Sequence, residues 1–192
     1  MNAAFASRIF SWQPSSDHGQ INHMEYRPLE GFVFAVTPFN FTSIAANLPT
    51  APALMGNTAV WKPATTAVLS NWYIMEVLRE AGLPHGVINF LPTRGSLAGR
   101  MVTSHEYMAG IHFTGSTDTF NLLWRETGAN LSKYVSYPRL VGETGGKDFV
   151  FAYPSAEVTA VAVAWQGAPS STRARSAAPP QGHTYRRASG RL

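Results

Sequence analysis

Short apolar runs alternate along the chain with longer segments of helical periodicity. Each run is rich in β-branched or aromatic residues and is bounded by glycine, proline or polar residues, which is typical of buried strands. The predicted strands are residues 31–37, 58–62, 87–91, 109–114 and 148–153. Helices are predicted over residues 43–55, about 97–104 and about 115–128.

The clearest helix lies between the second and third predicted strands. Thr65 or Thr66 can cap its start, and Gly82 followed by Pro84 ends it. Its apolar residues fall largely along one side: Val68, Trp72, Met75, Val77 and Leu78. This spacing is typical of an amphipathic helix.

Strands that alternate with helices at this spacing predict βαβ units with right-handed crossovers. The expected fold class is α/β, with an incomplete Rossmann-like parallel sheet, flanking helices and a disordered C-terminal tail. Residues 27–157 form the expected α/β domain. Residues 1–26 are polar and aperiodic, which indicates a lead-in segment without regular structure. Residues 158–192 are dense in alanine, serine, arginine, proline and glycine, and are expected to be disordered.

Composition fits a globular protein, because 45% of the 192 residues are hydrophobic and five are tryptophan. The net charge of +4 comes from the tail. Residues 1–157 carry all 11 acidic side chains, and their formal net charge is −1. A basic tail can bind nucleic acid or an anionic membrane. No aromatic platform or basic helix face accompanies it, so we expect neither partner.

Several classes of protein are excluded by what the sequence lacks. No apolar run reaches the roughly 20 residues of a membrane helix, so we expect a soluble protein. No secretory signal is recognised, and the expected location is cytoplasmic, or the mitochondrial matrix in a eukaryote. The absence of cysteine excludes disulfides, thiolate metal sites and thiol catalysis in this chain. The six histidines lack metal-ligand spacing, so no metal is expected.

Parallel sheets bind ligands beyond the carboxyl ends of their strands. The loops there hold residues 38–40, 62–65 and 115–117. In FTGST, Gly115 permits close approach of a phosphate, the following helix offers free N–H groups, and Ser116 adds a hydroxyl. The usual GxGxxG pattern is absent, so a plain glycine turn is the alternative.

Three further side chains at strand ends can carry chemistry. Lys62 can donate to ribose hydroxyls, or it is a solvated lysine. The Asn40 amide can donate to a developing oxyanion, or it forms an Asx turn. Glu143, beside two glycines in GETGGK, can act as a general base, or it is a turn residue.

The order of these motifs along the chain resembles that of a known family. TPFNF, GNTAVWKPA, HFTGS and GETGGKD follow one another as in the aldehyde dehydrogenase superfamily. More narrowly, EYRPLEGFVFAVTPFNFTSIAANLPTAPALMGN and YPRLVGETGGKDF resemble the branch of 1-pyrroline-5-carboxylate (L-glutamate γ-semialdehyde) dehydrogenases. The resemblance runs from about residue 13 to residue 158.

The resemblance implies a partial NAD-binding domain over residues 27–157. It implies oxidation of L-glutamate γ-semialdehyde to glutamate with NAD, a small-molecule aldehyde as partner, and a homo-oligomeric parent enzyme. Asn40 resembles the oxyanion-hole amide and Glu143 the general base. The cofactor would be held by Lys62 at a ribose, by Gly115 and Ser116 at the pyrophosphate, and by Pro38 and Phe39.

Three positions depart from the wider superfamily. Phe120 stands where many members have glycine, as in the semialdehyde branch, and Thr65 stands where many have glutamate. The nucleophilic cysteine of the family follows the general base by about 34 residues. Ala177 stands at that position. We therefore expect a chain without the catalytic thiol and without turnover.

The tail suggests a cause for the missing thiol. Residues 168–177 can be written in codons that spell AFEYQGQKC in a neighbouring frame, with the cysteine at the expected spacing. We therefore hypothesise that the chain represents part of a longer enzyme whose gene is read out of frame from about residue 158–166 onward. The alternatives are a non-catalytic nucleotide-binding truncation product and part of another aldehyde dehydrogenase.

Overall fold

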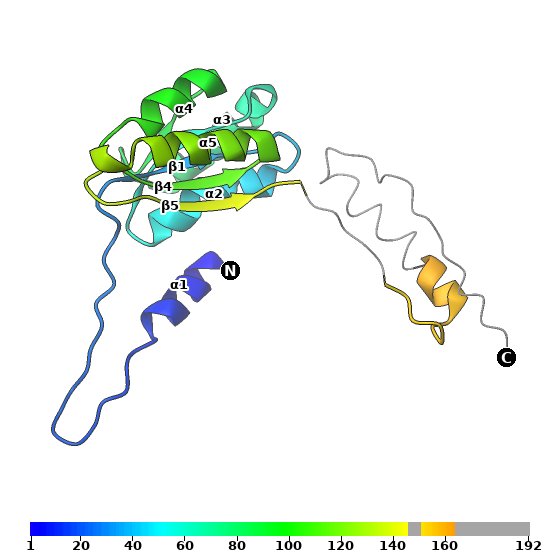
Figure 1. Ribbon diagram of the computed structural model, residues 1–192, viewed down its shortest axis with the longest axis horizontal. Helices are drawn as coiled ribbons and strands as arrows, with labels where there is room; N and C mark the ends of the chain where they lie inside the picture. Colours follow the sequence, from blue (N-terminus) through cyan, green and yellow to red (C-terminus); the bar gives the residue numbers. More distant parts are fainter. Residues whose placement is uncertain (146–150, 164–192) are drawn as a thin grey trace. The chain divides into compact units, whose positions relative to one another are not determined.

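The computed structural model describes residues 1–145 and 151–163. Two compact units, Met1–Thr144 and Gly145–Leu192, make up the chain. The first unit holds one parallel sheet with strand order β3-β2-β1-β4-β5, of which Figure 1 labels β1, β4 and β5. Its strands are β1 (Phe32–Val36), β2 (Thr58–Lys62), β3 (Ile88–Phe90), β4 (Met108–Thr114) and β5 (Arg139–Glu143).

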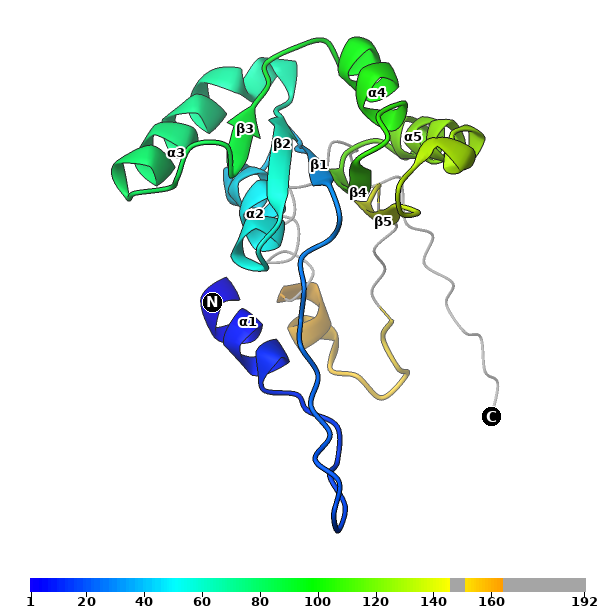
Figure 2. The same cartoon turned by 90° about the vertical axis from the view of Figure 1, so that its left-hand side faces the viewer.

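Helices cover both faces of this sheet. They are α2 (Thr42–Leu54), α3 (Val68–Glu80), α4 (Gly95–Thr103) and α5 (Thr117–Ala129), with short 3₁₀ turns η1 (Thr65–Ala67) and η2 (Leu131–Lys133). Figure 2 shows α2 and α3 together on one side and α4 and α5 on the other. The direction of the crossovers reverses between β1 and β4, which is the arrangement of a doubly wound, Rossmann-like sheet.

Each face of the sheet has its own apolar layer. On the α4–α5 face, the buried layer consists of Phe34, Ala98, Val102, Met108, Ile111, Phe113 and Leu123. On the α2–α3 face, it consists of Ala45, Ala59, Trp61, Met75 and Ile88. Side chains alternate between faces along a strand, so these layers fix the face of every strand position. The predicted α/β class with a parallel sheet is confirmed.

The first four predicted strands are confirmed, but the fifth is not. β5 comes earlier, at Arg139–Glu143, where Pro138 precedes the strand and Gly142 lies inside it. Those residues have low β-propensity, and full-length pairing with β4 outweighs it. Of the strand predicted over residues 148–153, positions 148–150 lie outside the described residues, and residues 151–153 form no strand.

The lead-in segment was expected to lack regular structure, and that expectation is wrong for its first residues. Helix α1 spans Asn2–Phe10 and has no buried residue. The side-chain amide of Asn2 donates to the side chain of Asn47 on α2. Farther along, Gln13 binds both backbone groups of Met24, with N–O distances of 3.1 and 2.8 Å. Local hydrogen bonds of this kind replace burial in this segment.

Helix α3 begins later than predicted. Neither Thr65 nor Thr66 caps it, because both lie in η1 and the N-cap position is Ala67. Its inner side also differs from the prediction, since Asn71 and Met75 are buried while Trp72 and Val77 are exposed. Residues four apart lie on one side of a helix, so the inner side of α3 is centred on Asn71 and Met75.

The second unit is described over residues 151–163. Residues 158–163 are helical, so the expectation of a disordered tail is wrong for these first residues. The Glu157 carboxylate caps this helix by accepting from the N–H groups of Thr159 and Ala160, and these hydrogen bonds lower the pKa of Glu157. The rest of the expected tail, residues 164–192, lies outside the described residues.

Among the described helices, none is long and apolar enough to cross a membrane.

Candidate functional site

The carboxyl ends of four strands bring the predicted site residues to one edge of the sheet. Val36, the last residue of β1, pairs with Lys62 on β2 and with Phe113 on β4. Thr114, the last residue of β4, pairs with Glu143 on β5. The loops after β1, β2 and β4 therefore lie along the same edge as the end of β5, at the point where the crossovers diverge.

Lys62 lies at this edge with its side chain on the α4–α5 face. Its Nζ is 3.7 Å from the point that a Cβ at Gly95, the first residue of α4, would occupy. The residue is only 8% exposed, and desolvation lowers the pKa of its ammonium group. Within the described residues, no carboxylate lies at ion-pair distance from it. Lys62 is therefore not a solvated lysine, but a largely desolvated cation without a carboxylate partner among the described residues.

The loop between β4 and α5 forms a glycine turn onto a helix N-terminus. The Ser116 Oγ accepts a 3.3 Å hydrogen bond from the N–H of Thr119 and lies 2.8 Å from the Thr119 hydroxyl, so it caps α5. Gly115 donates its N–H to the carbonyl oxygen of Glu143 at 3.1 Å. With the Ser116 hydroxyl and the Gly115 N–H engaged, the groups left for an anion are the backbone N–H donors of the first turn of α5.

The loop after β1 is anchored by Thr37. Its N–H donates to the Lys62 carbonyl at 3.2 Å, and its hydroxyl accepts from the Trp61 indole at 3.0 Å. Beyond this anchor, Pro38 is buried, Phe39 is 61% exposed and Asn40 is half-buried just before α2 begins. The loop therefore exposes the ring of Phe39 and leads through Asn40 into α2.

Glu143 is the exposed last residue of β5. Its neighbour Gly142 faces α5, because the Phe120 ring from α5 meets the position of a Gly142 Cβ. By alternation, the Glu143 side chain points to the opposite face, on which α2 lies. The candidate site is thus two-sided: Lys62 and the α5 N-terminus lie on one face, while Glu143 points to the other, where α2 begins two residues after Asn40.

Two residues of this edge were missed by sequence reasoning. Thr37 is buried and holds the ends of β1 and β2 together, but a lone threonine after a strand has no distinctive pattern. Gly95 opens α4 beside the Lys62 ammonium. The loop after β3 could have been found by the rule that selected the other loops, since it also follows the carboxyl end of a strand.

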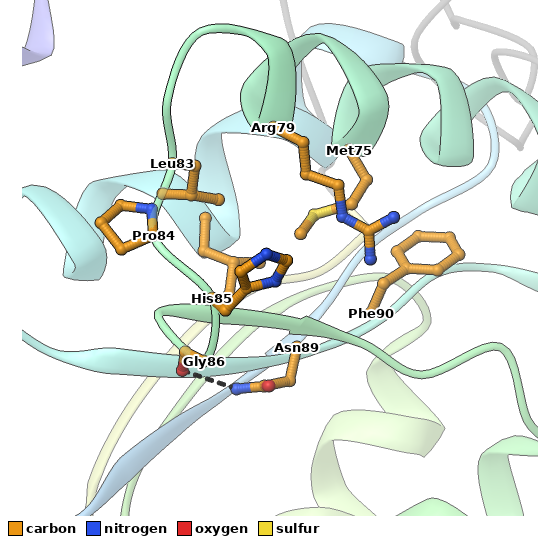
Figure 3. Close-up of a pocket in the computed structure, with 9 residues that line it drawn as sticks. Met75, Arg79, Leu83, Pro84, His85, Gly86, Asn89 and Phe90 are labelled. Carbon is orange, nitrogen blue, oxygen red and sulfur yellow. Dashed lines mark hydrogen bonds between the residues drawn. The ribbon is translucent and has the colours of Figure 1, made fainter.

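An open pocket of about 220 Å³ lies away from these residues, between α3 and β3 (Figure 3). It is lined by Met75, Arg79, Leu83, Pro84, His85, Gly86, Ile88, Asn89 and Phe90. Two of its polar side chains are engaged within the protein: Arg79 pairs with Glu76 at 2.8 Å, and Asn89 donates to the Gly86 carbonyl at 2.8 Å. In the part of the chain that the structure describes, no cluster of His, Asp or Glu could hold a metal ion.

Comparison with known proteins finds one family to which this chain is similar. The model of the aldehyde dehydrogenase family matches residues 2–172. A mitochondrial delta-1-pyrroline-5-carboxylate dehydrogenase of Dictyostelium discoideum is 52% identical over 160 residues, which are 82% of this chain and 29% of that protein. The Mus musculus protein of the same name is 51% identical, over 83% of this chain and 28% of that protein.

Solved structures agree with these relatives. The Mycobacterium tuberculosis delta-pyrroline-5-carboxylate dehydrogenase bound with NAD superimposes with a TM-score of 0.79 at 55% identity, covering 85% of this chain and 30% of that one. A Thermus thermophilus 1-pyrroline-5-carboxylate dehydrogenase variant gives a TM-score of 0.67 at 31% identity, with 76% and 29% covered. The chain thus spans less than a third of the length of these relatives.

Proposed function

The chain belongs to the aldehyde dehydrogenase family, and from this we propose that its carboxyl sheet edge is the NAD site of an enzyme that oxidises L-glutamate γ-semialdehyde to glutamate in proline breakdown. The observation that carries the proposal is Lys62. It is a largely buried ammonium without a carboxylate partner among the described residues, next to the start of α4 and on the same face as the α5 N-terminus.

In this proposal, the α4–α5 face holds the nucleotide. The Lys62 ammonium donates to ribose hydroxyls, which compensates for its desolvation. The first turn of α5, opened by Gly115 and capped by Ser116, supplies N–H donors and a positive dipole to the pyrophosphate. Pro38 and Phe39 line the path of the cofactor across the edge, at the divergence between β1 and β4.

The other face carries the chemistry of the parent enzyme. There, Asn40 donates its amide to the oxyanion that forms when a thiolate attacks the aldehyde. NAD, when bound, accepts the hydride. Glu143 accepts a proton from the water that hydrolyses the resulting thioester. The location on the α2 face and the exposure of Glu143 support these roles, because its carboxylate is accessible to water.

The chain itself has no cysteine, so we propose that it has no thiol-dependent turnover. Ala177, where the family spacing would place the nucleophile, lies outside the described residues. We propose that residues 27–157 are the partial NAD-binding domain and that residues 158–192 are an out-of-frame tail. Sequencing the gene from the codon of Phe151 onward tests this. A correction of one or two bases that restores Gln-Lys-Cys supports the proposal, and a confirmed frame overturns it.

The missing thiol also favours a second candidate function, a non-catalytic nucleotide-binding module. Both candidates require that NAD bind at the sheet edge and that Lys62 contribute. Calorimetric titration of the full chain with NAD tests this shared requirement. Lys62→Met should weaken binding, while Lys133→Met, at an exposed lysine on η2, should leave it unchanged. Equal affinities for all three proteins would contradict both candidates.

The substrate and the cellular setting are part of the same proposal. Relatives about 50% identical bear the name of the pyrroline-5-carboxylate enzymes, and several of these names include the mitochondrion. We therefore propose the same aldehyde, a homo-oligomeric parent, and the mitochondrial matrix in a eukaryote or the cytoplasm otherwise. A gene with the corrected frame, assayed against several aldehydes, separates this substrate from those of other aldehyde dehydrogenases.

A further inference from the structure

The aromatic ring of Phe120 fills the space above Gly142. A Cβ built on Gly142 would lie 2.3 to 2.6 Å from three carbons of this ring, so a side chain at this position would displace the ring. The ring is itself held by two others: it stacks on Phe113 with centroids 5.4 Å apart and meets Trp124 edge-on at 5.6 Å. The Phe120 ring therefore packs between α5 and the end of β5, with two neighbouring rings against it.

Few other contacts fix the end of β5. The strand is at the edge of the described sheet, and four of its five residues are exposed. One side of it pairs with β4, where Phe113 lies opposite Gly142 and Thr114 opposite Glu143. Past the last strand residue of β4, the Gly115 N–H donates to the Glu143 carbonyl. The Phe120 ring restrains the strand in the remaining direction, perpendicular to the sheet.

We propose that Phe120 is a positioning residue for Glu143. By pressing on Gly142, the ring fixes the plane of the peptide that leads into Glu143, keeps the Gly115 hydrogen bond closed, and directs the carboxylate to the α2 face. The inference rests on the proposed role of Glu143 as general base. Phe120 reaches that carboxylate only through the backbone, from the opposite face of the sheet.

A purely structural role for Phe120 makes a different prediction. If the ring only contributed to the apolar layer of the α4–α5 face, its truncation would lower the stability of the whole unit. Amides throughout β4 would then exchange faster by one common factor, because they would exchange through global unfolding. A positioning role predicts local opening, confined to Gly115 and the end of β5.

Native-state hydrogen exchange of the full chain, followed by NMR, separates the two roles. In Phe120→Ala, the Gly115 N–H should exchange at least about tenfold faster than in the wild type, after correction for the change at Ile111 in the middle of β4. Phe120→Tyr keeps the ring and should restore the slow exchange. Trp124→Leu removes one of the two rings that hold Phe120 but leaves Phe120 in place, so it should accelerate Gly115 exchange less than Phe120→Ala does. If Phe120→Ala does not fold, Phe120→Leu takes its place.

Two further readouts complete the test. The ¹³C chemical shift of the Glu143 carboxyl at a fixed pH should move in Phe120→Ala and return in Phe120→Tyr. Gly142→Ala should accelerate Gly115 exchange strongly in the wild-type background and much less beside Phe120→Ala, because the clash is then gone. Equal acceleration at Gly115 and Ile111, with an unchanged chemical shift of the Glu143 carboxyl, overturns the proposal. These measurements need no nucleotide, so their failure is distinct from a failure to bind NAD.

Discussion

The backbone N–H of Gly115 donates a 3.1 Å hydrogen bond to the carbonyl oxygen of Glu143. This contact extends the pairing of β4 and β5 one step beyond Thr114 and Glu143, the last paired residues. It joins the turn that opens α5 to the proposed general base. The proposed pyrophosphate site and the proposed base are therefore joined by backbone pairing at one corner of the sheet, although they serve opposite faces.

Replacing Lys62 with methionine should stabilise the fold and weaken NAD binding. Methionine removes the cost of the desolvated ammonium, so thermal or urea unfolding should show a gain of about 1 kcal/mol at neutral pH. The loss of a charged donor should reduce NAD affinity by about tenfold or more. Lys133→Met is the matched control and should change neither quantity. A variant that loses stability at neutral pH would contradict the burial of an uncompensated charge.

The stability of the wild type should also depend on pH through Lys62. Because burial lowers the pKa of Lys62, the unfolded chain holds the lysine proton at pH values where the folded chain has released it. Stability therefore rises as the pH increases from the folded pKa toward the ordinary lysine value. Over that window the advantage of Lys62→Met should shrink, which urea titrations at several pH values would detect. If the stability difference between Lys62→Met and the wild type did not change with pH, it would not arise from the Lys62 ammonium.

Ser116 should contribute to stability mainly as a helix cap. Its hydroxyl is committed to Thr119, so Ser116→Ala should cost about 1 kcal/mol, whereas Ser116→Gly should cost only a few tenths of a kcal/mol. The affinity for NAD should change little in Ser116→Gly, since the backbone donors of α5 remain. Urea unfolding and calorimetry measure the two effects. A large loss of affinity with unchanged stability would instead identify the hydroxyl as a direct phosphate ligand.

Gly31 should be among the least replaceable residues. Its φ is +133°, and a Cβ there would lie 2.0 Å from the carbonyl oxygen of Tyr107. Gly31→Ala should therefore cost about 3 kcal/mol or more. Gly82→Ala is the control, because Gly82 has a φ of +95° but open space around it, and should cost only about 1–2 kcal/mol. Similar losses in the two variants would show that backbone strain, and not the clash, dominates.

The helix over residues 158–163 should melt on acidification. Hydrogen bonds from Thr159 and Ala160 lower the pKa of Glu157, so the cap is present above the ordinary glutamate pKa and is lost as the pH falls through the folded value. Chemical shifts of Thr159 and Ala160 should follow this titration. Glu157→Gln should remove the pH dependence. Shifts that stay constant down to low pH would exclude the carboxylate cap.

Much of the fold was predictable because its local patterns and its packing agree. The runs at residues 31–37, 58–62 and 109–114 are apolar and β-branched, and they become the three central strands, buried on both faces. The edge strand β5 was missed for the opposite reason. It is mostly exposed and contains Gly142, so its strand conformation comes from pairing with β4, a long-range interaction that no local pattern reveals.

The site was predictable in position but not in orientation. The rule that parallel strands bind ligands at their carboxyl ends selects Lys62, Gly115 and Asn40 from the sequence. The side chains of Lys62 and Glu143 point to opposite faces of the sheet. This depends on strand register, which the sequence alone leaves open. Helix α3 shows the same limit, since its periodicity did not reveal that Asn71 would be buried and Val77 exposed.

The most direct test of the central claim is an NMR titration of the full ¹⁵N-labelled chain with NAD, because it reports where the nucleotide binds. The sheet-edge site predicts saturable shifts at Lys62, Gly95 and the first turn of α5, greatly reduced in Lys62→Met. Shifts confined to the pocket around Arg79 and His85, or no shifts at all, would contradict it.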